Sequence, residues 1–280
     1  MSKIFQNTVC LSVTFHKAGD HRKGDKEAIE TDANKRELSL TKKIFRSRAY
    51  RDMWKLNFKT KEWIARRAVP SPLRHGTFLI PQQLVDEVVE KVKEAEEKFN
   101  ELADQFVKEY PALIEEARNS LQSQFNEANY PSAKVIRSKF WVSRMFVKFD
   151  AVKGVEQNKE IQDAMDDIRF ALREGLLELV SKLQGMLSEK KDGRKCGVRS
   201  STLDAFNEWV ELLPKRNILD DDELKGLAEK ARSIMKGKTK MELRDNMGLR
   251  KEMSSKMDEI GTQLKTLLEV CPRRAFNFEE

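Results

Sequence analysis

The chain has few of the residues that build disulfide-linked or metal-bound domains. It contains three cysteines, three histidines, seven prolines and twelve glycines in 280 residues. Cys10, Cys196 and Cys271 are far apart and odd in number, so they indicate reduced thiols and argue against a disulfide framework or a zinc knuckle. Because proline and glycine interrupt helices, their scarcity favours long helices.

Long apolar segments are also missing from the sequence. No run approaches the roughly 20 apolar residues that a membrane span needs. The first residues, MSKIFQNTVCLSVTF, contain one lysine and no small-residue cleavage site, which argues against a signal peptide. We therefore expect a cytoplasmic protein without a membrane partner.

No set of residues suited to catalysis can be assembled from the chain. No serine or cysteine has a nearby base, so nucleophilic catalysis has no candidate. His16, Asp20 and His21 lie close together, but without a fourth ligand we interpret them as solvated loop residues. We predict no catalytic residue, no cofactor and no metal site, and hence a protein that is not an enzyme.

Hydrophobic periodicity predicts a mainly α-helical fold with a small antiparallel β element. The alternation in residues 8–16 predicts a strand, and we expect residues 17–35 to form a loop and a short strand to follow within 38–45. Residues 69–81 are predicted as a turn-rich connector. Beyond them, apolar residues recur every three or four positions over three heptads, as in a coiled coil, at Val85, Val88, Val92, Ala95, Phe99, Leu102 and Phe106.

The same helical period returns from about residue 156 to 186, after an insert at 129–152 that contains a predicted strand. Two long helices separated by an insert indicate an elongated antiparallel coiled-coil hairpin. A basic, glycine-containing stretch at 191–200 predicts a linker, followed by a C-terminal helical bundle at 201–280. We therefore divide the chain into residues 1–190, the linker, and residues 201–280.

Residues 40–67, LTKKIFRSRAYRDMWKLNFKTKEWIARR, are the most unusual stretch. They hold ten lysines and arginines against two acids, a net charge of +8, whereas the whole chain carries +7. On a helix spanning about 46–68, Tyr50, Trp54 and Phe58 share a face and basic residues flank them. Bases could stack on these rings while the cations neutralise phosphates. The alternative is a central helix packed on both apolar faces, with its basic residues reaching outward at the edge.

Two motif regions resemble a known family. Ser71-Pro72, Arg74-His75-Gly76 and Pro81 precede the long helix, and Tyr130-Pro131-Ser132 with Phe140 follows it. Together, over about residues 6–190, they resemble an uncharacterised bacterial and phage domain of unknown function that is found on prophages and conjugative elements. The resemblance implies a mobile-element protein in a bacterial host cell, often encoded near a MoxR-type AAA+ ATPase and a von Willebrand A protein. It implies no catalytic residues.

Two functions are compatible with these patterns. The first is a helical interaction adaptor or structural component that binds a protein partner, such as an AAA+ ATPase, or a second copy of itself. Its predicted contact residues are those of the apolar seam: Val85, Val88, Val92, Phe99, Leu102 and Phe106. The alternative is a protein that binds DNA or RNA through the basic and aromatic stretch 42–67, assisted by Arg194, Lys195 and Arg199. Its named contact residues are Arg48, Tyr50, Arg51, Trp54, Lys55, Phe58, Lys59 and Arg66.

Overall fold

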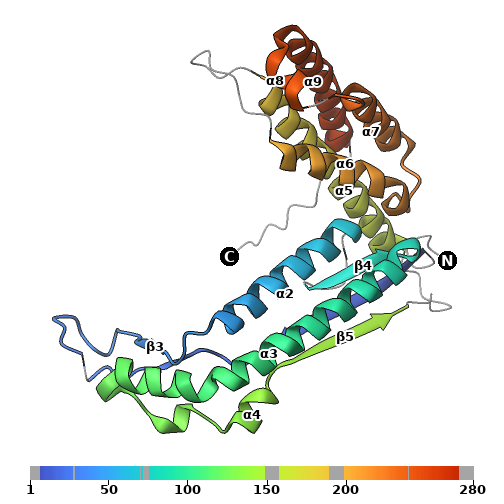
Figure 1. The fold of residues 1–280 in the computed structure, drawn as a ribbon. Helices are drawn as coiled ribbons and strands as arrows, with labels where there is room; N and C mark the ends of the chain where they lie inside the picture. Colours follow the sequence, from blue (N-terminus) through green and yellow to red (C-terminus); the bar gives the residue numbers. More distant parts are fainter. Residues whose placement is uncertain are drawn as a thin grey trace. The chain divides into compact units, whose positions relative to one another are not determined.

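A computed structural model describes residues 7–27, 29–69, 71, 76–148, 158–188, 199–238 and 240–270. Within these ranges the chain is mainly α-helical, with eight α-helices, a three-stranded sheet and a two-stranded sheet (Figure 1). This confirms the predicted fold class, mainly α with a minor antiparallel β component. No helix in the described ranges has the length and apolarity that crossing a membrane requires.

The elements of the described ranges follow one another in a fixed order along the chain. Three strands come first, β1 (Thr8–His16), β2 (His21–Lys23) and β3 (Thr41–Lys43), and helix α2 (Arg48–Arg67) follows them. The middle of the chain contains β4 (Thr77–Pro81), α3 (Val85–Leu121), α4 (Ala133–Arg137) and β5 (Trp141–Val147). Helices α5 (Asn158–Leu187), α6 (Ser200–Arg216), α7 (Asp222–Met235), α8 (Lys240–Asp245) and α9 (Met247–Val270) complete it.

Contacts divide the chain into two compact units. Unit 1 comprises residues 1–11, 65–85 and 146–280, and unit 2 comprises residues 12–64 and 86–145. This division differs from the one that the sequence suggested, because α6 to α9 belong to the same unit as α5. Most of the proposed linker, residues 191–198, lies outside the described residues.

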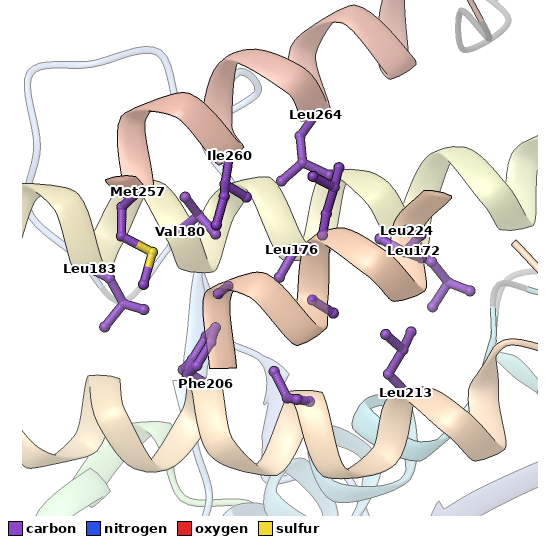
Figure 2. Packing of buried hydrophobic residues seen from close by; sticks show 14 of the residues in the cluster. Leu172, Leu176, Val180, Leu183, Phe206, Leu213, Leu224, Met257, Ile260 and Leu264 are labelled. Carbon is purple, nitrogen blue, oxygen red and sulfur yellow. The ribbon is translucent and has the colours of Figure 1, made fainter. Parts of the chain in front are cut away.

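Unit 1 is organised around α5 and α9. The two helices run antiparallel, since Gln184 hydrogen-bonds to Asp258 at one end and Arg173 donates to the carbonyl oxygen of Leu267 at the other. Figure 2 shows the apolar side chains of α5, α6, α7 and α9 meeting in one core. An ideal Cβ on Gly261 of α9 would lie 3.9 Å from the side chains of Leu177 and Val180, so the two helices approach closely at this point.

Unit 2 contains a core of aromatic rings between α2, α3 and neighbouring segments. Phe106 of α3 lies 5.0 Å from Phe45 and 5.3 Å from Phe140, measured between ring centroids. Tyr50 of α2 joins the same group of rings and donates its hydroxyl hydrogen to the Ala18 carbonyl oxygen. Helices α2 and α3 run side by side in Figure 1, which agrees with these contacts.

The two sheets use several of the predicted strands. Strand β1 has the predicted bounds and is the central strand of the order β4-β1-β5. Strand β2 pairs antiparallel with β3, with His21 opposite Lys43. Strand β4 lies within residues 69–81, which the sequence analysis had assigned to a connector. Its carbonyl oxygen at Leu79 accepts a hydrogen bond from the Val69 amide.

The predicted hairpin of two long helices takes a different form. The apolar periodicity predicts that the helix after Pro81 packs against the helix from about residue 156. In the structure, α5 pairs with α9 inside unit 1. The apolar seam of α3 is buried in unit 2, with Val88, Val92, Phe99 and Phe106 at most 1% exposed.

Candidate nucleic-acid interface

Helix α2 has one buried face and one basic, exposed face. Its buried residues are Ala49, Tyr50, Met53, Thr60 and Ile64. Its exposed residues are Arg48, Arg51, Trp54, Lys55, Phe58, Lys59, Glu62, Ala65 and Arg66. Both sets follow the spacing of three and four residues that places side chains on one side of a helix. The predicted basic helix at 46–68 is therefore confirmed as α2, within two residues at its start.

The three aromatic residues of the predicted row do not share one environment. Tyr50 is buried, whereas Trp54 is 53% exposed and Phe58 is 67% exposed. Residues four apart on an α-helix are displaced by about 40° around the axis, so two such steps turn the row by about 80°. The row therefore passes from the core at Tyr50 to the surface at Phe58. Trp54 and Phe58 therefore present the exposed rings of this row.

The Trp54 ring has an ammonium group on one side. The Nζ atom of Lys17 lies 3.2 Å from the Trp54 ring centroid, within the range of a cation–π contact. It also lies 5.6 Å from the ring of Tyr50. This Nζ atom has no hydrogen-bond acceptor among the described residues. The Lys17 ammonium thus lies against one face of the Trp54 indole, and about half of the Trp54 surface is exposed.

The exposed face of α2 is positively charged, although it also carries the carboxylates of Asp52 and Glu62. The Asp52 carboxylate lies 3.1 Å from the Nζ of Lys55 and 3.7 Å from the Nε of Arg48. The hydrogen bond from Lys55, with the positive charges of Lys55, Arg48 and Arg51, lowers the pKa of Asp52 below its ordinary 3.8. Arg51 and Lys59 form no ion pair with any described residue. We name the residues Arg48, Arg51, Trp54, Lys55, Phe58 and Lys59 the α2 surface.

A cleft of about 630 Å³ lies at the start of α2. Its lining comes from the end of the β1–β2 connection, from β2 and β3, from the segment that joins β3 to α2, and from the first two turns of α2: Asp20, His21, Lys43, Phe45, Arg46, Ser47, Arg48, Tyr50, Arg51 and Trp54. Four of these residues are lysines or arginines and one is an acid. All of them belong to unit 2. The cleft therefore adjoins the α2 surface, sharing Arg48, Arg51 and Trp54 with it.

The other basic residues of the predicted interface belong to unit 1 or lie outside the described residues. Arg66 belongs to unit 1, where its Nη1 lies 3.2 Å from a carboxylate oxygen of Glu208. Arg199 is exposed and also belongs to unit 1. Arg194 and Lys195 lie outside the described residues. All six cationic and exposed aromatic candidates of residues 48–59 thus lie on one helix face within unit 2, whereas Arg66 and Arg199 belong to unit 1.

The predicted partner-binding seam is mostly interior. Val88, Val92, Phe99 and Phe106 are buried within the chain, while Val85 and Leu102 are half-buried. A side chain that is already packed in the core offers no surface to a second protein. The apolar seam is thus accounted for by the folding of the chain itself.

Sequence reasoning did not identify Lys17 as a member of this site, and it did not name Lys43 or Arg46 individually. Lys43 and Arg46 lie within the predicted basic stretch 42–67, where they were counted only as part of its charge. Only the pairing of β2 with β3 brings His21 and Lys43 together beside α2. The one signal in the sequence is the excess of basic residues in HRK at 21–23 and TKK at 41–43, the two segments that form this pair.

We expect the buried ammonium of Lys17 to make stability increase with pH. Burial lowers the pKa of Lys17 from 10.5 to about 8, and the Asp20 charge offsets only part of this effect. Between these two values the unfolded chain binds more protons than the folded chain, so the free energy of unfolding rises with pH. The ceiling for one proton is about 1.4 kcal/mol per pH unit, and partial solvent exposure reduces it.

Urea unfolding at about pH 7.5 and about pH 9.5 measures this rise in the wild type and in Lys17→Met. The rise should be smaller in Lys17→Met, and the exposed-lysine control Lys23→Met should behave like the wild type. The range stays below pH 10 because burial, together with Asp20, raises the pKa of Tyr50 to about 12, and this group destabilises the folded state at higher pH. Equal rises in Lys17→Met and the wild type would contradict the assignment.

Comparison with known proteins identifies a family. Residues 23–209 match the family described as "Protein of unknown function (DUF3150)". The match covers more than half of the chain. The chain belongs to this family. No curated protein and no solved structure matches it. The predicted resemblance to an uncharacterised domain family is confirmed, and the match extends beyond the predicted end at 190 into α6.

Proposed function

We propose that this DUF3150 protein binds single-stranded nucleic acid through the α2 surface. The observation that carries the proposal is the exposure of Trp54 and Phe58 among four basic side chains on one helix face. Exposed aromatic rings in a positively charged groove are the usual means of holding single strands, since bases stack on the rings while cations contact the phosphates. Exposed aromatic rings and a cluster of basic side chains occur together on this helix face.

The arrangement favours single strands over duplexes. A ring can stack on a base only when that base is unpaired and accessible, whereas duplex bases stack on one another. Trp54 and Phe58 are one helical turn apart on α2, with Arg51, Lys55 and Lys59 alongside. We therefore expect sequence-tolerant binding that combines stacking and phosphate contacts and that weakens steeply with salt.

Fluorescence anisotropy with labelled single-stranded DNA and RNA tests the proposal. Four phosphate contacts, by Arg48, Arg51, Lys55 and Lys59, give an expected slope of log affinity against log salt of about −3. Lys55→Glu/Lys59→Glu should make this slope shallower by at least about 1.4. The matched control Lys134→Glu/Lys139→Glu reverses two exposed lysines that lie neither on α2 nor in the cleft, and it should leave the slope unchanged.

The stacking contribution is measured separately. Phe58→Ala should weaken binding by about 5- to 150-fold, the range that loss of one stacked base gives, with little change in salt slope. Absence of oligonucleotide binding at low salt would reject the proposal. Binding that is equally weakened by the control pair would also reject it, because the attraction would then reflect only the net charge of the protein.

An exposed sheet edge favours a second candidate function, that of an interaction adaptor. Trp141 is 49% exposed and Met145 is 59% exposed on β5, which has a strand neighbour on one side only among the described residues. Edge strands with exposed apolar side chains are suited to binding another protein. The resemblance noted above makes an AAA+ ATPase of a phage or conjugative element a natural partner. In the titration above, an adaptor would bind no oligonucleotide even at low salt.

A further inference from the structure

The cleft at the start of α2 has the dimensions and composition of a small-molecule site. Its volume of about 630 Å³ lies within the usual range of ligand pockets. Phe45 and Tyr50 supply apolar wall, and Trp54 supplies a ring that is half exposed. The polar part of the lining is strongly asymmetric in charge, with Lys43, Arg46, Arg48 and Arg51 against Asp20 alone.

The single carboxylate in the lining is already engaged. Oδ1 of Asp20 lies 2.8 Å from Nδ1 of His21, and Oδ2 lies 3.5 Å from the Nζ of Lys43. Arg48 lies beside Asp52 at 3.7 Å. Asp20 therefore offsets one positive charge at one end of the lining, and a net positive charge is left over the rest.

Two guanidinium groups are left without a carboxylate. Arg46 and Arg51 are exposed and form no ion pair with any of the described residues. Guanidinium groups match the geometry of phosphate oxygens, to which they donate paired hydrogen bonds. The first turn of α2 contains no acidic residue, so the helix dipole adds to the positive potential at this end. An anion with several oxygen atoms is the ligand that this lining suits.

The aromatic wall restricts the ligand further. One side of the Trp54 ring is covered by the Lys17 ammonium at 3.2 Å from the centroid. The remaining open surface is available to one planar group. A ligand that joins a planar ring to a phosphate would place the ring on Trp54 and the phosphate at Arg46 and Arg51.

We propose that the cleft between β2, β3 and the start of α2 is a nucleotide-phosphate site. Its ligand chemistry is a nucleobase against Trp54 joined to a phosphate at Arg46 and Arg51. The inference goes beyond the α2 surface, because the cleft holds such a group whether or not a strand lies along the helix. The nucleotide has two sources: the phosphorylated end of a strand, or a free nucleoside phosphate.

The experiment has two arms that separate these sources. In the first, the anisotropy assay compares oligonucleotides of about ten nucleotides that carry a 5′-phosphate, a 3′-phosphate or hydroxyls at both ends. In the second, isothermal titration calorimetry follows the binding of ATP, ADP and AMP. We expect binding to depend on the phosphate in at least one arm, and Arg46→Gln to weaken that binding roughly tenfold, as loss of a charged hydrogen bond does.

Lys139→Gln is the matched control, since Lys139 is an exposed cation that neither belongs to the α2 surface nor lines the cleft. It should change binding in the phosphate-dependent arm by no more than about twofold. Circular dichroism and thermal melting check that both variants fold, and both residues are exposed, so neither change disturbs the core.

Two results would overturn the inference. The first is that a terminal phosphate leaves oligonucleotide affinity unchanged and no free nucleotide binds. The second is that Arg46→Gln and Lys139→Gln have equal effects in both arms. Oligonucleotides with hydroxyl ends test the α2 surface alone. If they bind while phosphates make no difference, the α2 surface stands and the cleft site fails. Free nucleotide binding that requires Arg46, without oligonucleotide binding, supports the cleft site and rejects the α2 surface.

Discussion

Replacing Asp221 with alanine is expected to lower the free energy of unfolding by about 3–5 kcal/mol, the usual cost of leaving one member of a buried ion pair alone. Arg173 on α5 donates from Nε to Oδ2 of Asp221 at 2.8 Å and from Nη2 to Oδ1 at 3.2 Å. The side chains are 9% and 4% exposed, respectively. Without Asp221, the guanidinium loses its buried partner, although it still contacts the Glu223 carboxylate and the Leu267 carbonyl oxygen.

The same substitution removes a helix cap. Oδ1 of Asp221 accepts a hydrogen bond from the Leu224 amide, which is one of the unpaired donors in the first turn of α7. Loss of such a cap typically costs about 1 kcal/mol. Because α7 packs in the core of unit 1, loosening its first turn weakens the contacts of Leu224 as well.

Urea unfolding of Asp221→Ala and of Asp222→Ala provides the measurement. Asp222 is exposed, so its substitution should change the free energy of unfolding by about 0.5 kcal/mol or less. The double variant Arg173→Met/Asp221→Leu should be more stable than Asp221→Ala, because it removes both charges from the interior together. A loss of less than about 1 kcal/mol in Asp221→Ala would show that the pair contributes little.

The pKa of Asp221 gives the expected dependence on pH. Burial acts to raise the pKa, but the hydrogen bonds from Arg173 and from the Leu224 amide outweigh it and hold the pKa below 3.8. The folded-state pKa is thus lower than the unfolded one. The contribution of this carboxylate to stability is therefore fully present above pH 3.8 and is lost as the pH falls through the folded-state value.

The sequence predicts local elements better than it predicts the contacts between them. Local patterns were sufficient for β1, for α2 and for the start and end of α5, because alternation and the 3.6-residue period depend only on neighbouring residues. Strand β4 was missed because the prolines and glycine around it resemble a connector, and its hydrogen bond to Val69 joins two separate segments. Helix α8 is only six residues long and has too few turns for a periodic signal.

Which helices pack together could not be read from the same patterns. An apolar stripe shows that a helix face is buried but does not identify what covers it. The stripe of α5 fits any helix of similar length, and the structure pairs it with α9. The candidate site was also only partly predictable from the sequence, for the same reason. Its basic helix was evident from composition, whereas the cleft depends on the pairing of β2 with β3.

The aromatic residues also show that composition does not reveal which side chains are buried. Replacing Phe106 with alanine is expected to lower the free energy of unfolding by about 3–5 kcal/mol, the usual cost of removing a buried phenylalanine side chain. Phe106 is fully buried and its ring packs against those of Phe45, Tyr50, Tyr110 and Phe140. The substitution would leave a cavity in the centre of the unit 2 core.

Phe58→Ala is the matched control because it is the same chemical change at a site that is 67% exposed. It should change the free energy of unfolding by about 0.5 kcal/mol or less, although it is expected to weaken oligonucleotide binding. The two variants therefore separate the aromatic residues that hold the fold together from those that serve a ligand. If Phe58→Ala were as destabilising as Phe106→Ala, the exposed ring would belong to the core, and the α2 surface would lose its main support.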